Sequence, residues 1–128
     1  MKRRKDEGNF LVKFFKSFKH GVDGINYSIE KEINFLLIMI LTILALLAGF
    51  LLNISQAELC LVVISMGTMM AAELINCSIE AAIDLVTLET NELAKISKDC
   101  AGAAALVLVI VSLFVDGIIF IPKIIELL

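Results

Sequence analysis

Three long apolar runs divide the chain. Residues 35–52 contain no charged side chain, and as a helix they would extend about 27 Å, close to the thickness of the hydrocarbon core of a bilayer. Residues 59–86 form a longer run that several carboxylates interrupt, and residues 100–121 form a third run that stops before Pro122. A proline ends or breaks a helix. The pattern therefore predicts three transmembrane helices, the last of them ending at Pro122.

The segment before these runs, residues 9–31, has a different periodicity. At 100° per residue its apolar side chains fall in one sector and its lysines lie on the other side. The apolar set is Phe10, Leu11, Phe14, Phe15, Phe18, Val22, Ile25 and Ile29. This pattern is typical of a helix in the membrane interface. We predict an amphipathic surface helix, which either only anchors the protein or also frames an active site.

Composition agrees with a membrane location. Hydrophobic residues make up 59% of the 128 residues and the mean hydropathy is +0.94, more than a small soluble domain can bury. We therefore expect an all-α membrane protein with one domain, residues 1–128, and no nucleic-acid partner. The cysteines, Cys60, Cys77 and Cys100, all lie in apolar runs and should be reduced. Since His20 is the only histidine, a metal site built from sulfur and imidazole is not expected.

The basic side chains are distributed unequally along the chain. Lys95 and Lys98 lie between the second and third runs, and only Lys123 follows the third. The others precede the first run: Lys2, Arg3, Arg4, Lys5, Lys13, Lys16, Lys19 and Lys31. Basic residues stay on the cytoplasmic side of a membrane protein. The N-terminus and the loop before Lys95 should therefore be cytoplasmic.

Polar side chains share one face of the second run. Glu73, Asn76, Glu80 and Asp84 lie within a narrow sector of a helix, stacked along roughly 16 Å. A carboxylate in hydrocarbon costs several kcal/mol, so such residues usually face a cavity, a partner or an ion. Oxygen ligands suit a hard cation such as Mg²⁺, which is often shared with substrate phosphates. The stripe predicts a functional site.

Two charged residues, Lys98 and Asp99, directly precede the third run. They should lie at the same depth as the polar face of the second run. Lys98 can neutralise phosphate charge, and Asp99 can orient a ligand or pair with the lysine. The chain has no G-x-x-x-x-G-K-[ST] phosphate loop. Any nucleotide must therefore be held by a metal, by side chains and by other backbone groups.

These residues form patterns that resemble a known family. Glu73, Asn76, Ser78, Ile79, Glu80 and Asp84 match E-x-x-N-x-[ST/A]-I-E-x-x-x-D. The run Ala94–Asp99 matches A-K-[IL]-[AS]-K-D, and Glu32–Phe35 matches E-x-N-F. From about residue 14 to residue 123, the chain resembles the small integral-membrane lipid kinases of bacteria, the diacylglycerol kinase/undecaprenol kinase family. The combined spacing is specific, whereas each motif alone is weak.

The resemblance implies a homotrimer in the bacterial plasma membrane, with active sites at subunit boundaries near the cytoplasmic face. It also implies phosphorylation of a lipid alcohol by MgATP. In the implied roles Glu73 is the general base, the Mg²⁺ ligands are Glu32 and Glu80, and the groups that hold substrate and phosphates are Asn76, Lys98 and Asp99. Two positions depart from the family. Leu36 stands where a basic residue is common, and Asn91 where relatives often carry histidine.

The substrate and the class of function retain alternatives. The E-x-N-F segment and the ending "IIFIPKI" resemble the Gram-positive members, which favours undecaprenol over diacylglycerol as the lipid alcohol. The catalytic residues do not separate these two substrates. An ion-coupled transporter or channel subunit would also explain intramembrane carboxylates. It would not explain why they gather at one membrane face with Glu32 and Lys98, and a non-catalytic scaffold would have no use for them.

Overall fold

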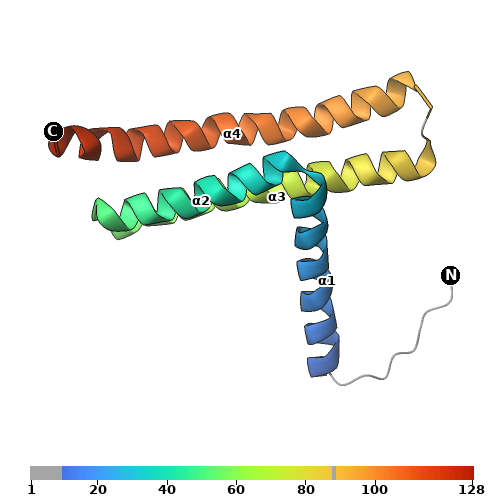
Figure 1. Ribbon diagram of the computed structural model, residues 1–128, viewed down its shortest axis with the longest axis horizontal. Helices are drawn as coiled ribbons and strands as arrows, with labels where there is room; N and C mark the ends of the chain where they lie inside the picture. The colour runs from blue at the N-terminus through green and yellow to red at the C-terminus, as the bar shows by residue number, and fades with distance from the viewer. Residues whose placement is uncertain (1–9, 88) are drawn as a thin grey trace.

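The computed structural model describes residues 10–87 and 89–128, and these residues form helices joined by short turns (Figure 1). The helices are α1 (Phe10–Lys31), α2 (Ile33–Leu51), α3 (Gln56–Val86) and α4 (Glu92–Glu126). The last three are each long and apolar enough to cross a membrane. This confirms the predicted all-α architecture with three membrane-crossing helices. The basic residues Lys2, Arg3, Arg4 and Lys5 and the predicted helix start at Asn9 lie outside the described residues.

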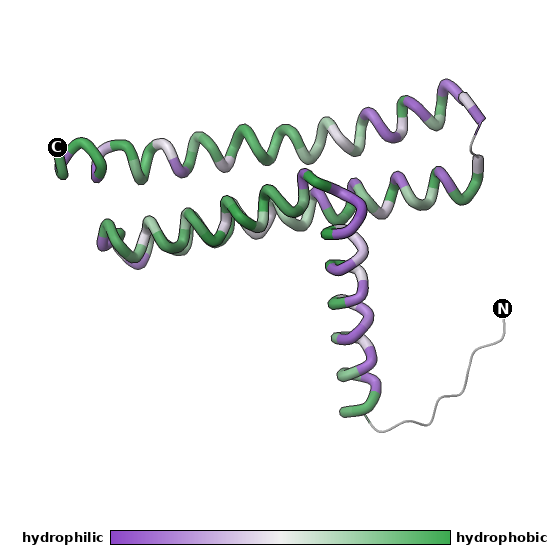
Figure 2. The backbone as a smooth tube through the Cα atoms, in the orientation of Figure 1, coloured by the Kyte–Doolittle hydropathy of each residue, from purple (hydrophilic) through white to green (hydrophobic). Residues whose placement is uncertain are grey.

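The three long helices lie alongside one another, and α1 projects away from them from the start of α2 (Figure 1). Helix α3 packs against both α2 and α4, so it is the central helix of the three. The turn between α3 and α4 lies at one end of the bundle, and the turn between α2 and α3 lies at the other end, beside the C-terminus. Figure 2 shows hydrophobic positions along α2 and most of α4, whereas hydrophilic positions gather on α1 and near the α3–α4 turn.

The turn between α2 and α3 is fixed by local chemistry. Asn53 has a φ of 48°, a left-handed conformation that asparagine tolerates well. A Cβ atom on Gly49 would lie 2.7 Å from Cδ1 of Ile54, so a larger residue here would make the Ile54 side chain shift. Helix α3 then begins with a capping box. The Ser55 amide donates to Glu58 Oε2 at 2.7 Å, and the Glu58 amide donates to Ser55 Oγ at 3.2 Å.

The buried core is small for a chain of this length. Phe35 and Val62 are fully buried, and a cluster of apolar side chains joins the three long helices: Ile38, Val62, Met66, Met69 and Ile119. Most other large apolar side chains on α2, α3 and α4 are exposed. A soluble domain does not leave so much contiguous apolar surface in water. The packing therefore agrees with helices whose outer faces contact lipid.

The predicted end of the third membrane helix at Pro122 is wrong. Helix α4 starts at Glu92, continues through Pro122 and ends at Glu126. Proline removes one backbone hydrogen bond, but contacts on both sides of it hold this part of α4 in place. Ile119 is buried in the core cluster, and Lys123 Nζ lies 3.8 Å from Glu58 Oε2 at the start of α3. This tertiary packing outweighs the local preference of proline for a helix end.

Candidate active site

A cavity of about 290 Å³ lies among the three long helices, toward the end that carries the α3–α4 turn. Its polar lining consists of Asn34 from α2 and of Glu73 and Asn76 from α3. Glu73 is 4% exposed and Asn76 is 7% exposed. The two side chains are held there because α3 presents them to the gap between α2 and α4. A carboxyl group and two amides thus line one partly open cavity in a largely apolar bundle.

The hydrogen bonding of this cavity is incomplete. Asn76 Nδ2 donates to Glu80 Oε1 at 3.3 Å. Glu73 Oε1 and Asn76 Oδ1 are buried and have no hydrogen-bond partner among the described residues. A buried acceptor without a donor costs about 1–3 kcal/mol, so such atoms call for an explanation. Both are acceptors, which suits a ligand that brings a hydroxyl or another donor.

Small side chains on α4 close one wall of the cavity. Gly102 and Ala105 face Glu73 and Asn76 across it. A Cβ atom built on Gly102 would lie 4.0 Å from Asn76 Oδ1, an ordinary van der Waals distance. Small residues let helix backbones approach closely in a membrane. Helix α4 therefore comes near the polar face of α3 without filling the cavity.

Two further carboxylates surround Glu73. Glu32 lies at the junction of α1 and α2, where it is the N-cap residue of α2, but its side chain makes no capping hydrogen bond. Glu32 and Glu80 are both half-buried and lie close enough for their charges to act on Glu73. Of the residues that the structure describes, no three metal-binding side chains converge on one point. A cation would need further ligands in addition to Glu32 and Glu80.

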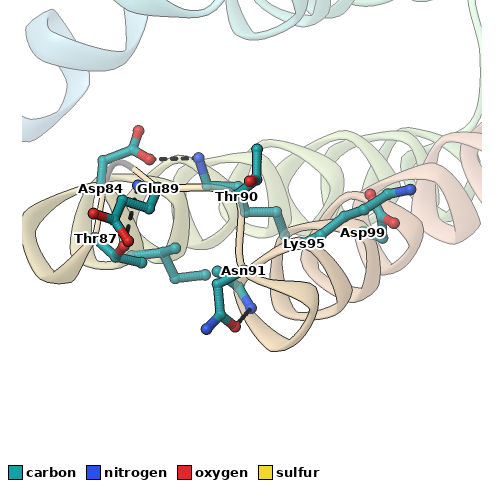
Figure 3. Close-up of a pocket in the computed structure, with 10 residues that line it drawn as sticks. Asp84, Thr87, Glu89, Thr90, Asn91, Lys95 and Asp99 are labelled. Carbon is teal, nitrogen blue, oxygen red and sulfur yellow. Dashed lines mark hydrogen bonds and ion pairs between the residues drawn. The ribbon is translucent and has the colours of Figure 1, made fainter.

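Charged and polar residues also form an open pocket of about 270 Å³ around the α3–α4 turn (Figure 3). Lys98 Nζ lies 2.5 Å from Asp84 Oδ1 and so joins α4 to the polar face of α3. Lys98 is also within electrostatic range of Glu80. Its partner is therefore Asp84, whereas the sequence suggested Asp99 as a possible partner. Asp99 lines the same pocket, together with Lys95.

Asn91 has a structural role that the sequence did not reveal. Its side-chain oxygen accepts hydrogen bonds from the amides of Leu93 and Ala94, at 2.9 and 3.2 Å. It therefore caps the N-terminus of α4, and Figure 3 shows it at the rim of the pocket. The signal was an asparagine directly before an acidic first turn. The cap determines where α4 begins and hence how Lys98 faces Asp84.

The predicted site residues thus lie in two connected groups. Glu73 and Asn76 line the cavity among the three long helices, with Glu32 and Glu80 beside them. Lys98 and Asp99 line the open pocket. Glu80 connects the groups, because it bonds Asn76 and lies near Lys98. Sequence reasoning gave Asn34 no role, although it is the asparagine of the E-x-N-F match at Glu32–Phe35.

One protein family and three relatives match most of this chain. Residues 19–120 match the family described as prokaryotic diacylglycerol kinase. The undecaprenol kinase of Bacillus subtilis is 37% identical over 119 residues, which cover 93% of this chain and 97% of that protein. The diacylglycerol kinase of Synechocystis is 27% identical over 126 residues, covering 98% of this chain and 72% of that protein.

A third relative, the diacylglycerol kinase of Pseudomonas aeruginosa, is 29% identical over 97 residues, covering 76% of this chain and 79% of that protein. These similarities favour a kinase over the transporter and the scaffold that intramembrane carboxylates alone would allow. They extend over all three long helices and both groups of site residues. The chain therefore belongs to the prokaryotic diacylglycerol kinase family of membrane lipid kinases.

Proposed function

We propose that this kinase transfers the γ-phosphoryl group of ATP to the hydroxyl group of undecaprenol, with Glu73 as the general base. The observation that carries the proposal is the Glu73 carboxyl group, which is buried in a cavity within an apolar bundle and has an unpartnered oxygen. A lipid hydroxyl is a donor that can enter from the membrane and satisfy this acceptor. The same oxygen is then placed to take the proton.

In the proposed reaction the lipid oxygen attacks the γ-phosphorus. The O–H proton passes to Glu73, the new P–O bond forms, and the bond between the γ-phosphorus and the bridging oxygen breaks to release ADP. A protein contributes little covalent chemistry to phosphoryl transfer, so positioning and charge stabilisation account for most of the catalysis. Asn76 supports the positioning, because its amide lies in the same cavity one helical turn from the base.

Glu32 and Glu80 are the proposed ligands of Mg²⁺. This cation usually keeps water and binds through one or two protein carboxylates plus substrate phosphates. Two half-buried carboxylates fit that donor set. Glu32, at the start of α2, makes no capping hydrogen bond, and Glu80 lies on the polar face of α3. When bound, the cation would neutralise charge on the phosphates. Lys98 and Asp99, at the open pocket, are the proposed contacts to the nucleotide.

The chain is also proposed to act as a homotrimer with shared active sites. The cavity around Glu73 is open on one side, and the outer faces of α2 and α4 carry many exposed apolar side chains. Helix α1 is proposed to lie in the cytoplasmic interface of the bacterial plasma membrane. Its phenylalanines, Phe10, Phe14, Phe15 and Phe18, are exposed and available to acyl chains.

Undecaprenol is proposed as the substrate because the Bacillus relative with that name shares 37% of its residues with this chain. Diacylglycerol is the alternative, since relatives named diacylglycerol kinase share between 27% and 33% with this chain. The test uses purified protein in micelles with Mg²⁺, labelled ATP and either lipid, followed by extraction and chromatography. Label in undecaprenyl phosphate alone supports the proposal. Label in phosphatidic acid alone reassigns the substrate, and label in neither lipid rejects the kinase reaction.

A further inference from the structure

A second cavity lies in the bundle, next to the cavity that contains Glu73. Its volume is about 320 Å³, and it is bounded by α2, by Met66 and Met69 of α3, and by α4. Its lining is apolar except for two residues of α4, Ser112 and Asp116, which lie one helical turn apart. Ser112 is 2% exposed, and its Oγ atom and Asp116 Oδ1 are buried with no hydrogen-bond partner among the described residues.

This serine differs from other hydroxyl groups of the same bundle. Thr42 Oγ1 donates to the carbonyl oxygen of Ile38 at 2.8 Å, and Ser65 Oγ donates to that of Val62 at 3.0 Å. Such bonds to the preceding turn are the usual way to satisfy a hydroxyl group inside a helix. Ser112 makes none and lines the cavity instead. Its hydroxyl group therefore remains available to a ligand.

The two cavities adjoin each other but lie at different depths. Ile38 and Val109 line both of them. Glu58 and Lys123 mark one end of the bundle. Measured from that end by helical rise, Asp116 lies about 10 Å deep and Glu73 about 22 Å deep. By the same measure Ser112 lies about 6 Å and Asp116 about 12 Å from the level of Glu73, along the same gap between α2 and α4.

We propose that Ser112 and Asp116 bind the hydroxyl group of a lipid alcohol, in a second site that holds the substrate before it reaches Glu73. The identity of the ligand rests on the proposed function. A hydroxyl group on a hydrocarbon body matches one small polar pair in an apolar cavity, because each of the three groups can form a hydrogen bond. A phosphorylated lipid does not match, since its charges would be buried without a cation. The site therefore selects substrate over product.

The test is photolabelling of the full chain in micelles without ATP. The probe is a long-chain alcohol with a diazirine beside the carbon that bears the hydroxyl group, and the comparison probe is its methyl ether. We expect the alcohol to label both the neighbourhood of Glu73 and residues 112–120, which line the second cavity alone. In Asp116→Leu the label at residues 112–120 should fall about fivefold, the effect of one lost hydrogen bond, while the label near Glu73 persists.

Two serine variants provide a matched comparison that does not depend on the tolerance of Asp116 to replacement. Ser112→Ala should lower the same label, whereas Ser65→Ala, which removes a buried hydroxyl group bonded within its own helix, should leave it unchanged. Label confined to the neighbourhood of Glu73 would overturn the proposal. Such a result would mean that water or a side chain of a second copy occupies the cavity. Equal labelling by the methyl ether would overturn it as well.

The phosphorylation assay of the same preparation separates the two proposals. Protein that is labelled at residues 112–120 but phosphorylates no lipid rejects the kinase reaction and keeps the hydroxyl site. Protein that phosphorylates a lipid alcohol but is not labelled there keeps the reaction and rejects the site.

Discussion

At the scale of single residues, burial changes step by step along the polar face of α3. Glu73 and Asn76 are buried, Glu80 is half-buried and Asp84 is exposed. The same residue type can therefore serve different roles. A buried carboxylate with an unpartnered oxygen suits proton transfer, and a carboxylate nearer the surface suits a hydrated cation. The predictions at this scale separate those roles.

Replacing Glu73 with Gln should lower turnover by about two orders of magnitude or more, because an amide does not accept the hydroxyl proton and general base catalysis contributes that much. The helical content and micelle elution should match the unmodified protein, since the side chains are nearly isosteric. Turnover is measured with saturating lipid and ATP. Glu126→Gln, at the far end of α4, is the matched control. Near-normal turnover in Glu73→Gln would assign the base to another residue.

Replacing Glu32 or Glu80 with Gln should raise the Mg²⁺ concentration needed for half-maximal turnover. Each change removes one charged oxygen donor from the proposed cation site, and Mg²⁺ prefers such donors. The measurement is a Mg²⁺ titration at fixed ATP. Glu80→Gln keeps an oxygen that can still accept from Asn76 Nδ2, so the effect reports charge more than shape. An unchanged titration in both variants would argue against these residues as ligands.

At the scale of helices, α3 determines the geometry of the site, because it touches all the other helices and carries the polar face. Its first turn is fixed by the reciprocal hydrogen bonds of Ser55 and Glu58, and Glu58 also approaches Lys123 of α4. One cap thus connects the start of α3 to the end of α4. On α4 this contact lies directly after Pro122, within the helix.

Ser55→Ala should destabilise the folded protein by about 1 kcal/mol, the usual effect of losing an N-cap side chain. The measurement is equilibrium unfolding in mixed micelles, followed by the loss of helical signal. Ser97→Ala is the control, because Ser97 is an exposed serine of α4 outside the caps. Equal stability of the two variants would show that the capping box contributes little in the micelle.

At the scale of the whole molecule, the sequence predicted the class of fold well and the details of contact less well. Hydropathy located the three long helices, because membrane thickness constrains both length and composition. The partner of Lys98 was not predictable, since it depends on how α4 rotates against α3. The unpartnered state of Ser112 and Asp116 had no sequence signal either. A serine in a helix normally bonds its own backbone, and only the packing shows that this one does not.

The distribution of lysines between the two ends of the bundle predicts how the molecule is oriented in the membrane. Lys95 and Lys98 lie at the end with the α3–α4 turn, which also carries the proposed nucleotide contacts, and Lys123 lies at the opposite end. Basic residues favour the cytoplasmic side, so the α3–α4 turn should be cytoplasmic. In a variant without native cysteines, Gln56→Cys should react with an impermeant maleimide on intact cells, and Thr90→Cys only after permeabilisation. The reverse result would place the Lys98 pocket away from cytoplasmic ATP, and the proposed reaction would lose its phosphoryl donor.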